Sequence, residues 1–433
     1  MKEYCRIFAF VAMISILLVT GCTPEREKVK LRFSDWHLTE NVWEKSMTDA
    51  IRKFEEKNPE IQVLIEPVSF ADKDNRYIVE SEAGVAPDVF HVQCNSLQAY
   101  FAKGYARDLT RFVRREGGKR YTSSWLELPM SICRYNGRLM AMPGDYMSIV
   151  LFYNKTLFEK AGLDPQRPPV TWPEFIDISK KLTLDSDGNG SIDQWGFTTV
   201  GAVDPGFELR FSPFIWSFGG DYLTEDGKHS ALNRPETIEG FRFFVELYKK
   251  YEVVPPGILK RTPQDTRVQF ANQQAAMMFS SGWTIPDIDD INPMLKASEV
   301  LEAAPVPSNG KKVTSAWVSA WIMSSTTKHP NEAWKLIRFL TSKDMELKWF
   351  RDDGVLSSRK DVNRTPEVLN DKYAQVISSQ LPYARLVPQI KEWPEIITVV
   401  TKAVQDAINE IKTPEAAVLD AHVQVEKILQ RRE

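Results

Sequence analysis

A stretch in the first half of the chain constrains the fold most strongly. Residues 149–153 read IVLFY, an apolar and β-rich run of the kind that lies buried on both faces of a parallel sheet. Pro143, Gly144 and Asp145 precede this run and predict a turn before the strand. A short helical segment follows, and Pro173 then stands in the first turn of another helix. We expect one lobe to end and a second lobe to begin here.

Upstream of this stretch, strand and helix patterns alternate. Apolar and charged residues alternate over residues 29–33, which predicts a first strand. A helical pattern follows until Pro59, and residues 61–66 are expected to form the next strand. A β–α–β order requires parallel pairing. A third strand is expected at residues 89–92, and a second long apolar run at residues 317–324 is expected to return between the lobes. The pattern therefore predicts an α/β fold with two lobes, each a mostly parallel sheet flanked by helices, joined by hinge crossings.

The predicted domain boundaries follow the two crossings. Residues 29–144 and 320–373 are expected to form the N-terminal lobe. Residues 145–319 and 374–433 are expected to form the C-terminal lobe.

The N-terminus has the pattern of an export signal. Lys2 and Arg6 precede an uncharged run over residues 7–19, which is short for a membrane span but suits the core of a signal peptide. The run ends in VTGC, which resembles the lipobox of bacterial lipoproteins, in which the cysteine becomes lipid-modified. We therefore expect a signal peptide over residues 1–21, lipid attachment at Cys22, and a polar tether over residues 22–28.

Composition argues against several other classes of protein. The formal net charge of −3 leaves no basic surplus to bind nucleic acid. Only Cys94 and Cys133 remain beyond the leader and Cys22, so the chain has no disulfide scaffold, although a bridge between these two and a pair of free buried thiols both stay open. The histidines are scattered without metal-ligand spacing, and the chain has no nucleophile elbow and no phosphate-binding glycine loop. We expect neither a cofactor nor catalysis.

Candidate binding residues follow the strand ends, because ligands of open parallel sheets bind beyond the carboxyl ends of the strands. Aromatic rings beside amides and carboxylates suit sugars, whose C–H faces stack on rings while their hydroxyls form hydrogen bonds with planar polar groups. The strand ends and the lobe crossing supply such residues, namely Asp35, Trp36, Gln93, Asn95, Asp145, Tyr146 and Trp283.

The remaining tryptophans divide by their sequence context. Trp43 and Trp334 follow helical spacing and are expected in the core. Trp216, Trp317 and Trp393 fit either the core or the ligand site, and both interpretations stay open.

An acidic loop at residues 185–196 reads DSDGNGSIDQWG. Asp185, Asp187, Asn189 and Asp193 are spaced like oxygen ligands of an EF-hand calcium loop. The twelfth position is Gly196 rather than a bidentate glutamate, so an acidic surface turn is the favoured interpretation and a calcium site is the alternative.

Several motifs together resemble one family. They are YNGRLMAMP, YNK and TWPEF around the lobe crossing, with GVAPDVF, FAKGYARDL and MMFSSGW elsewhere. This set is similar to the extracellular solute-binding proteins of bacterial ABC importers, in their carbohydrate-binding branch. The resemblance implies that the ligand cleft is lined at or beside Trp36, Gln93, Asp145, Trp283, Trp317 and Trp393.

The function implied by the resemblance is capture of a sugar or oligosaccharide and its delivery to an ABC permease. The expected protein is a monomer outside the cytoplasm, held at a bacterial membrane by its N-terminal lipid. A binder of another solute, such as a peptide, a polyamine or a phosphoester, is the alternative within this class. A secreted glycoside hydrolase is the alternative from another class.

Overall fold

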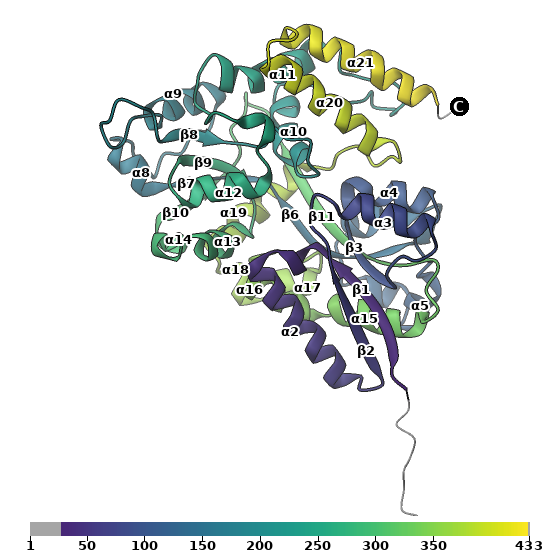
Figure 1. Cartoon of the computed structure of the whole chain (residues 1–433). Helices are drawn as coiled ribbons and strands as arrows, with labels where there is room; N and C mark the ends of the chain where they lie inside the picture. Colours follow the sequence, from purple (N-terminus) through teal and green to yellow (C-terminus); the bar gives the residue numbers. More distant parts are fainter. Residues whose placement is uncertain (1–26, 432–433) are drawn as a thin grey trace, which may run out of the picture.

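The computed structural model of this protein describes residues 27–431, so the expected signal peptide and Cys22 lie outside the described residues. Figure 1 shows two halves, each built on its own sheet, with two long strands running between them. Within residues 27–431, no helix combines the length and the apolar character needed to cross a membrane.

The first sheet has the strand order β12-β11-β3-β1-β2, and β6 also pairs with β11. Its centre is parallel, because β1 pairs in parallel with both β2 and β3. β11 runs antiparallel to β3 and β6, and parallel to β12. The strands are β1 (Val29–Asp35), β2 (Ile61–Pro67), β3 (Val89–Gln93), β6 (Ala141–Ser148), β11 (Thr314–Met323) and β12 (Ala384–Arg385).

The second sheet has the order β10-β7-β9-β8. Only β8 and β9 are parallel, while β7 is antiparallel to both of its neighbours. The expected parallel majority therefore holds for β1 to β3 but not for this sheet. The strands are β7 (Val150–Asn154), β8 (Trp195–Thr198), β9 (Ala275–Ser280) and β10 (Leu301–Ala304), and β4 (Arg134–Tyr135) and β5 (Arg138–Leu139) form a separate hairpin.

Helices cover both sheets. In the first part of the chain they are η1 (Trp36–Thr39), α2 (Asn41–Lys57), α3 (Lys73–Glu82), α4 (Cys94–Ala102), α5 (Thr110–Arg115), α6 (Lys119–Thr122), α7 (Glu127–Ile132), α8 (Lys155–Lys160), α9 (Trp172–Leu182) and α10 (Phe207–Ser217). Later come α11 (Pro235–Lys249), η2 (Ile258–Lys260), α12 (Pro263–Ala271), α13 (Thr284–Ile291), η3 (Pro293–Leu295), α14 (Ala297–Val300), α15 (Pro330–Leu340), α16 (Lys343–Asp353), α17 (Lys360–Asn363), α18 (Pro366–Leu369), α19 (Lys372–Gln380), η4 (Leu381–Tyr383), α20 (Trp393–Ile408) and α21 (Pro414–Gln430).

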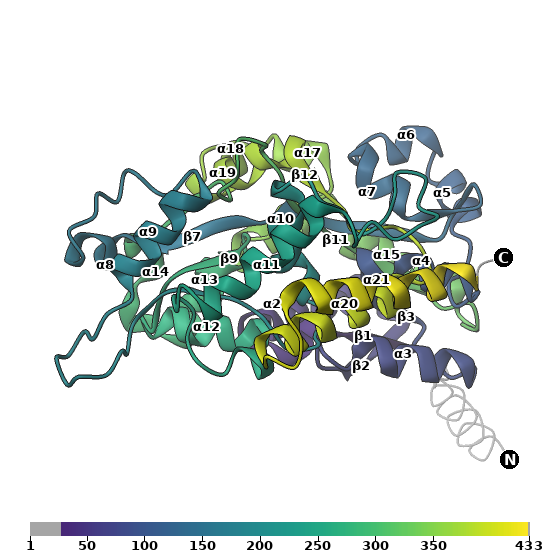
Figure 2. The same ribbon diagram turned by 90° about the horizontal axis from the view of Figure 1, so that it is seen from above.

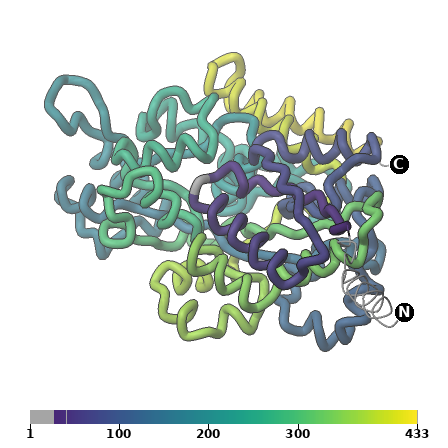
Figure 3. The backbone as a smooth tube through the Cα atoms, turned by 60° about the horizontal axis from the view of Figure 1, so that its bottom comes forward, coloured from purple at the N-terminus to yellow at the C-terminus, as the bar shows by residue number. Residues whose placement is uncertain are grey.

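The C-terminal helices join the two halves on one side. α20 and α21 lie along each other, and the view from above shows them crossing from α11 in the second half to α4 in the first half (Figure 2). On another side, the start of α2 lies beside α13 of the second half (Figure 3).

The two strands at the lobe crossing lie side by side. Ile149, between β6 and β7, donates its N–H to the carbonyl of Ser315 at 2.9 Å and accepts a 2.7 Å hydrogen bond from the Thr314 hydroxyl. The predicted turn at Pro143 to Asp145 is wrong, because these residues lie inside β6. Among the described strands β6 pairs with β11, its other edge makes only the isolated bridge between Asp145 and Ser357, and the register with β11 shifts between Val318 and Ala320, so a proline without an N–H is tolerated there.

Candidate ligand-binding site

A cavity of about 620 Å³ lies between the two halves of the molecule. Its walls come from η1, α2 and the loop after β2 on one side, and from α10, α12 and α13 on the other. The carboxyl ends of β1 and β9 lead into this cavity, as the rule for open sheets predicts. A volume of this size fits a small-molecule ligand.

Aromatic rings form much of the wall. Trp36 packs edge-on against Phe70 with ring centroids 5.8 Å apart, and Phe70 lies 6.1 Å from Trp317. Trp283, just after β9, packs edge-on against Trp317 at 5.7 Å. The exposed fractions of the three tryptophans are only 3 to 9 %, because both halves cover them. The structure therefore brings Trp36, Trp283 and Trp317 together, from three elements distant in the sequence.

Asp145 supplies a carboxylate at the base of this aromatic wall. Its Oδ2 accepts a 3.0 Å hydrogen bond from Nε1 of Trp317, and its Oδ1 accepts 2.7 Å hydrogen bonds from the backbone N–H and the hydroxyl of Ser319. These bonds fix the carboxylate and the Trp317 indole relative to each other, so the lobe crossing itself positions part of the site.

Charged residues of the second half complete the cavity. Arg267 on α12 pairs with Asp287 on α13 at 3.1 Å and with Glu40, beside α2, at 3.5 Å. Nε1 of Trp43 on α2 donates a 3.1 Å hydrogen bond to the other oxygen of Asp287. Burial raises the pKa of Asp287 to about 6, against the opposing effect of Arg267. These contacts link the two halves across the cavity in this structure.

Arg210 on α10 is a second buried cation that lines the cavity. Burial, with a smaller effect from Arg267, lowers the pKa of Arg210 to about 10. Asp204, which also lines the cavity, has its pKa raised by burial. The cavity therefore offers both donors and acceptors to the polar groups of a ligand.

Asp35 lies behind the wall rather than in it. Its side chain is fully buried between two histidines, with Nδ1 of His37 at 3.1 Å and Nδ1 of His91 at 3.3 Å. His91 stacks between Trp36 and Trp321, with ring centroids 4.2 Å and 3.8 Å away. Burial opposes the charge on His37, yet Asp35 raises the pKa of His37.

Gln93 and Asn95 contact the other half of the molecule. The side-chain amides of both residues donate to the carbonyl of Pro205, at 3.2 and 3.4 Å, and Asn95 also donates to Glu208 on α10. Burial raises the pKa of Glu208 to about 8. The two amides thus bridge the halves beside the cavity. Tyr146 is buried on β6 and does not contribute to the cavity wall.

Trp216 and Trp393 lie away from the cavity. Both side chains are at most 1 % exposed. Trp393, at the start of α20, packs edge-on against Tyr222 at 4.9 Å, and the Arg385 guanidinium covers the Trp216 ring at 4.8 Å. These two rings join the C-terminal helices to α10 instead of facing the space between the halves.

The acidic loop uses its carboxylates on its own backbone. Asp185 accepts hydrogen bonds from the N–H groups of Gly188 and Gly190, and Asp193 accepts from the N–H and hydroxyl of Ser186. Hydrogen bonds from these backbone amides lower the pKa values of Asp185 and Asp193.

Elsewhere, Cys94 and Cys133 are free and buried.

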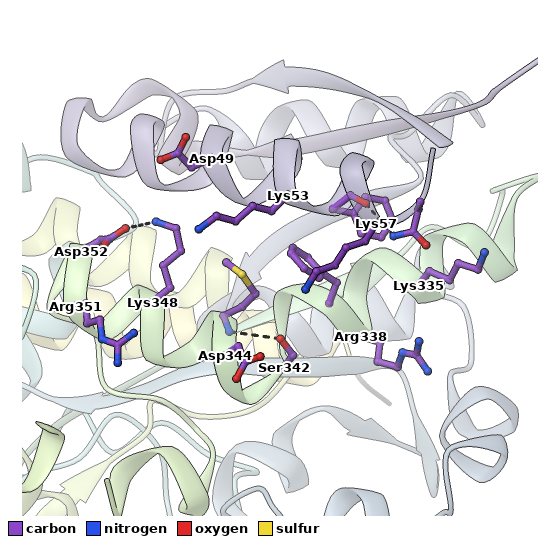
Figure 4. Close-up of a pocket in the computed structure, with 14 residues that line it drawn as sticks. Asp49, Lys53, Lys57, Lys335, Arg338, Ser342, Asp344, Lys348, Arg351 and Asp352 are labelled. Atoms are coloured by element: carbon purple, nitrogen blue, oxygen red, sulfur yellow. Dashed lines mark hydrogen bonds and ion pairs between the residues drawn. The ribbon is translucent and has the colours of Figure 1, made fainter. Parts of the chain in front are cut away.

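A wider groove of about 900 Å³ lies on the outside of the first half, between α2 and α15–α16 (Figure 4). Lysines and arginines line it, but several are already paired, as Lys335 is with Glu60 at 2.8 Å and Arg338 with Glu116 at 2.9 Å. Figure 4 also shows Lys348 directed at Asp352. The groove draws on one half only, and its aromatic lining residues are Phe54 and Phe339, with no tryptophan, so we place the candidate site in the smaller cavity.

Several site residues were missed from the sequence. Trp43 was expected in the core from its helical spacing and is buried in the core cluster, and it also lines the cavity and reaches Asp287. Arg210, Arg267 and Asp287 lie on helices of the second half and carry no signal in the strand pattern. One indication for His37 was available in the sequence, namely its position directly after Trp36 at the end of the first strand.

Residues 49–375 match the family described as bacterial extracellular solute-binding protein. A putative binding protein of Brucella abortus strain 2308 is 25% identical over 381 residues, which cover 88% of this chain and 89% of the relative.

Solved structures agree with this match over nearly the whole chain. An ABC transporter solute-binding protein of Thermotoga lettingae bound with alpha-D-tagatose has a TM-score of 0.85 and 26% identity, covering 93% of this chain and 100% of that one. Maltose-bound MalE3 of T. maritima has a TM-score of 0.82 and 25% identity, covering 92% of this chain and 100% of that one.

Proposed function

Because the chain belongs to the bacterial extracellular solute-binding protein family, we propose that it captures a sugar or oligosaccharide between its two lobes and delivers it to an ABC permease. The observation that carries this proposal is the aromatic and acidic cavity of about 620 Å³ whose walls come from both lobes. The structural relatives hold tagatose and maltose. Members of the family are binding proteins, and we expect no turnover of the ligand.

The proposed contacts divide into stacking and polar groups. Trp36 and Trp283 stack on the C–H faces of sugar rings, because each indole presents a large apolar face to the cavity. Asp145, Arg267 and Asp287 take the hydroxyl groups, because each offers planar hydrogen-bonding atoms in the cavity wall. Asp35, Gln93 and Asn95 support this set from behind or beside the cavity.

Ligand exchange requires the lobes to separate. The contacts between Trp43 and Asp287 and between Glu40 and Arg267 hold the lobes together over the cavity. The crossing at Ile149 is the natural hinge, because this one residue separates β6 from β7 and its carbonyl accepts a hydrogen bond from Thr314 at the start of β11. A ligand that touches both lobes shifts the population toward the closed form, which the permease is proposed to recognise.

Isothermal titration calorimetry with a panel of solutes tests this function. The panel contains maltose, maltotriose, tagatose and ribose, with sn-glycerol 3-phosphate, spermidine and a short peptide as the non-sugar arms. We expect saturable binding of at least one sugar, with a Kd of about 10 µM or tighter, equivalent to about −7 kcal/mol. Binding confined to a non-sugar arm would contradict the proposed ligand class, and hydrolysis of an oligosaccharide would favour a glycoside hydrolase.

We also propose that the protein is anchored outside the cytoplasm by lipid on Cys22. The support is the lipobox-like sequence VTGC after an apolar leader. Two or more acyl chains on one N-terminus bind a membrane stably, whereas one chain is marginal. Cys22→Ala is expected to leave the detergent phase in a Triton X-114 partition, while Cys94→Ala, a matched cysteine variant, stays in it. Equal partition of the Cys22 variant and wild type would refute the anchor.

A further inference from the structure

Three buried side chains that carry metal-ligating atoms converge behind Trp36. Nδ1 of His37 lies 3.1 Å from Oδ1 of Asp35, and Nδ1 of His91 lies 3.3 Å from Oδ2. Ligand atoms of the three side chains lie within 4.8 Å of one another. Among the described residues, neither Nδ1 atom nor Oδ2 of Asp35 makes an aligned hydrogen bond. A buried carboxylate needs a compensating partner, and a metal ion held by these three side chains is one partner that the arrangement can accept.

The hydrogen bonds of Ser319 show which nitrogen of His91 carries the proton. The Ser319 hydroxyl donates its single proton to Oδ1 of Asp145 at 2.7 Å. The same hydroxyl oxygen must then accept the 2.8 Å hydrogen bond that it shares with Nε2 of His91. Nε2 therefore holds the proton of the neutral ring, and Nδ1 presents its lone pair on the side of Asp35.

We propose that Asp35, His37 and His91 bind one divalent transition-metal ion, with zinc as the best fit. A lone pair on Nδ1 beside a carboxylate oxygen repels that oxygen unless a cation lies between them. Imidazole nitrogen and carboxylate oxygen are ordinary zinc ligands. The site lies behind the ligand cavity and does not depend on which solute the cavity holds.

The observed spacing agrees with zinc coordination. Zinc lies about 2.0 to 2.2 Å from nitrogen and oxygen ligands, so two ligands of a tetrahedral ion are about 3.4 Å apart. The Nδ1 atoms of His37 and His91 lie 3.1 and 3.3 Å from different oxygens of Asp35, so an ion held by both rings would contact both carboxylate oxygens, each at a separation close to that value. The hydrogen bond from Nε2 of His91 to Ser319 is the kind of outer contact that orients a metal-bound histidine.

The ligand cavity offers an approach to this site. His37 lines the main cavity and also a small neighbouring cavity of about 30 Å³ that His91 lines. The same histidines stack on cavity tryptophans, His91 on Trp36 at 4.2 Å and His37 on Trp43 at 4.2 Å. A bound ion would therefore hold two walls of the proposed sugar site in place.

Metal content of the wild-type protein tests the proposal without any variant. Tag-free protein is stripped with EDTA, dialysed, and loaded with Zn²⁺, Co²⁺ or Mg²⁺. We expect about one zinc ion per chain by mass spectrometry of the metal, a raised Tm with Zn²⁺ but not with Mg²⁺, and visible absorption bands with Co²⁺. Absence of retained zinc, of a Tm shift and of cobalt bands would overturn the proposal.

Variants locate the ion. His91→Gln is expected to abolish tight zinc binding, while His229→Gln, a variant of an exposed histidine paired with Glu426, is expected to bind as wild type does. Ser319→Ala keeps all three ligands and is expected to bind zinc about 10- to 100-fold more weakly. Zinc binding by His91→Gln at wild-type affinity would contradict the site, and if that variant fails to fold, Ser319→Ala and the cobalt spectrum of wild type decide the question. Sugar binding by zinc-free protein would leave the proposed function standing.

Discussion

The place of each tryptophan in the fold decides whether its ring can contact a ligand or belongs to the core. Trp36 and Trp283 come from different lobes and face one cavity, whereas Trp393 is fully buried under the C-terminal helices. Removing a ring from the cavity removes stacking and apolar contact with the ligand. Removing a ring from the core leaves a cavity that lowers the free energy of unfolding.

Trp36→Ala and Trp283→Ala are each expected to weaken sugar binding about 10- to 150-fold, equivalent to about 1.5 to 3 kcal/mol, because each removes one stacked ring. Calorimetry with the sugar identified from the panel measures the change. Trp393→Ala serves as the matched control and is expected to lower the free energy of unfolding by about 3 to 5 kcal/mol while sparing the affinity. Unchanged affinity in both cavity variants would place the ligand elsewhere.

Glu208 is expected to make the stability of the folded protein depend on pH, and the substitution Glu208→Gln should remove this dependence. Burial raises the pKa of Glu208 from 4.5 to about 8, so the folded protein holds a proton that the unfolded chain has lost. The stabilising effect of that proton is complete below about pH 4.5 and is lost as pH rises toward 8, by at most about 1.4 kcal/mol per pH unit.

Urea unfolding of wild type and Glu208→Gln at pH 5, 6, 7 and 9 measures this effect as the difference between their free energies of unfolding. We expect the free energy of unfolding of wild type to fall steadily relative to that of Glu208→Gln up to about pH 8, and the difference to change little at higher pH. Parallel pH curves for the two proteins would show that Glu208 is ionised over the whole range.

At this scale the sequence was informative close to the ends of strands. Trp36 directly follows β1, Trp283 lies in the loop after β9, and both line the cavity. Trp43 and Trp393 lie in amphipathic helices, where spacing alone cannot tell whether the buried side faces the core or the other lobe. Arg267 was invisible for the same reason, because its role arises only when α12 faces α2 across the cavity.

At the scale of elements, a local sequence signal located the start of α9. The TWPEF motif begins α9 with a capping box, in which the Thr171 hydroxyl accepts from the N–H of Glu174 and the Glu174 carboxylate accepts from the N–H of Thr171. The pairing of β7 with β10 and β9 was harder to foresee, because apolar runs buried on both faces read alike in parallel and antiparallel sheets.

Thr171→Ala is expected to lower the free energy of unfolding by about 1 kcal/mol, since it removes the cap of α9. Denaturant unfolding measures the loss. Thr171→Ser keeps the hydroxyl and is expected to retain most of the stability, and ligand affinity should be equal in all three proteins. An alanine variant as stable as wild type would mean that the cap contributes nothing.

At the scale of the whole molecule, the two lobes are held together by contacts over the cavity as well as by the hinge. The hydrogen bond from Trp43 to Asp287 is one of these contacts, and it crosses from α2 to α13. Such contacts favour the closed form even before a ligand binds, and their loss shifts the population toward the open form.

Trp43→Phe keeps an aromatic ring in the cavity but removes the N–H that Asp287 accepts. We expect sugar affinity to fall about 2- to 13-fold, the equivalent of one hydrogen bond, and the ligand-free protein to have a larger radius of gyration in X-ray scattering. Trp334→Phe is the matched control, because Nε1 of Trp334 donates to Glu116 within the first lobe. If both variants open the lobes equally, the contact over the cavity has no part in closure.

Native mass spectrometry of the protein, purified without denaturation from cells grown on mixed carbohydrates, tests directly whether the cavity holds a sugar. We expect a 1:1 adduct that fragments as a sugar or oligosaccharide in wild type, and its loss in the Trp36→Ala/Trp283→Ala double variant but not in Trp393→Ala. A peptide, polyamine or phosphoester adduct, or a sugar adduct that survives in the double variant, would contradict this expectation.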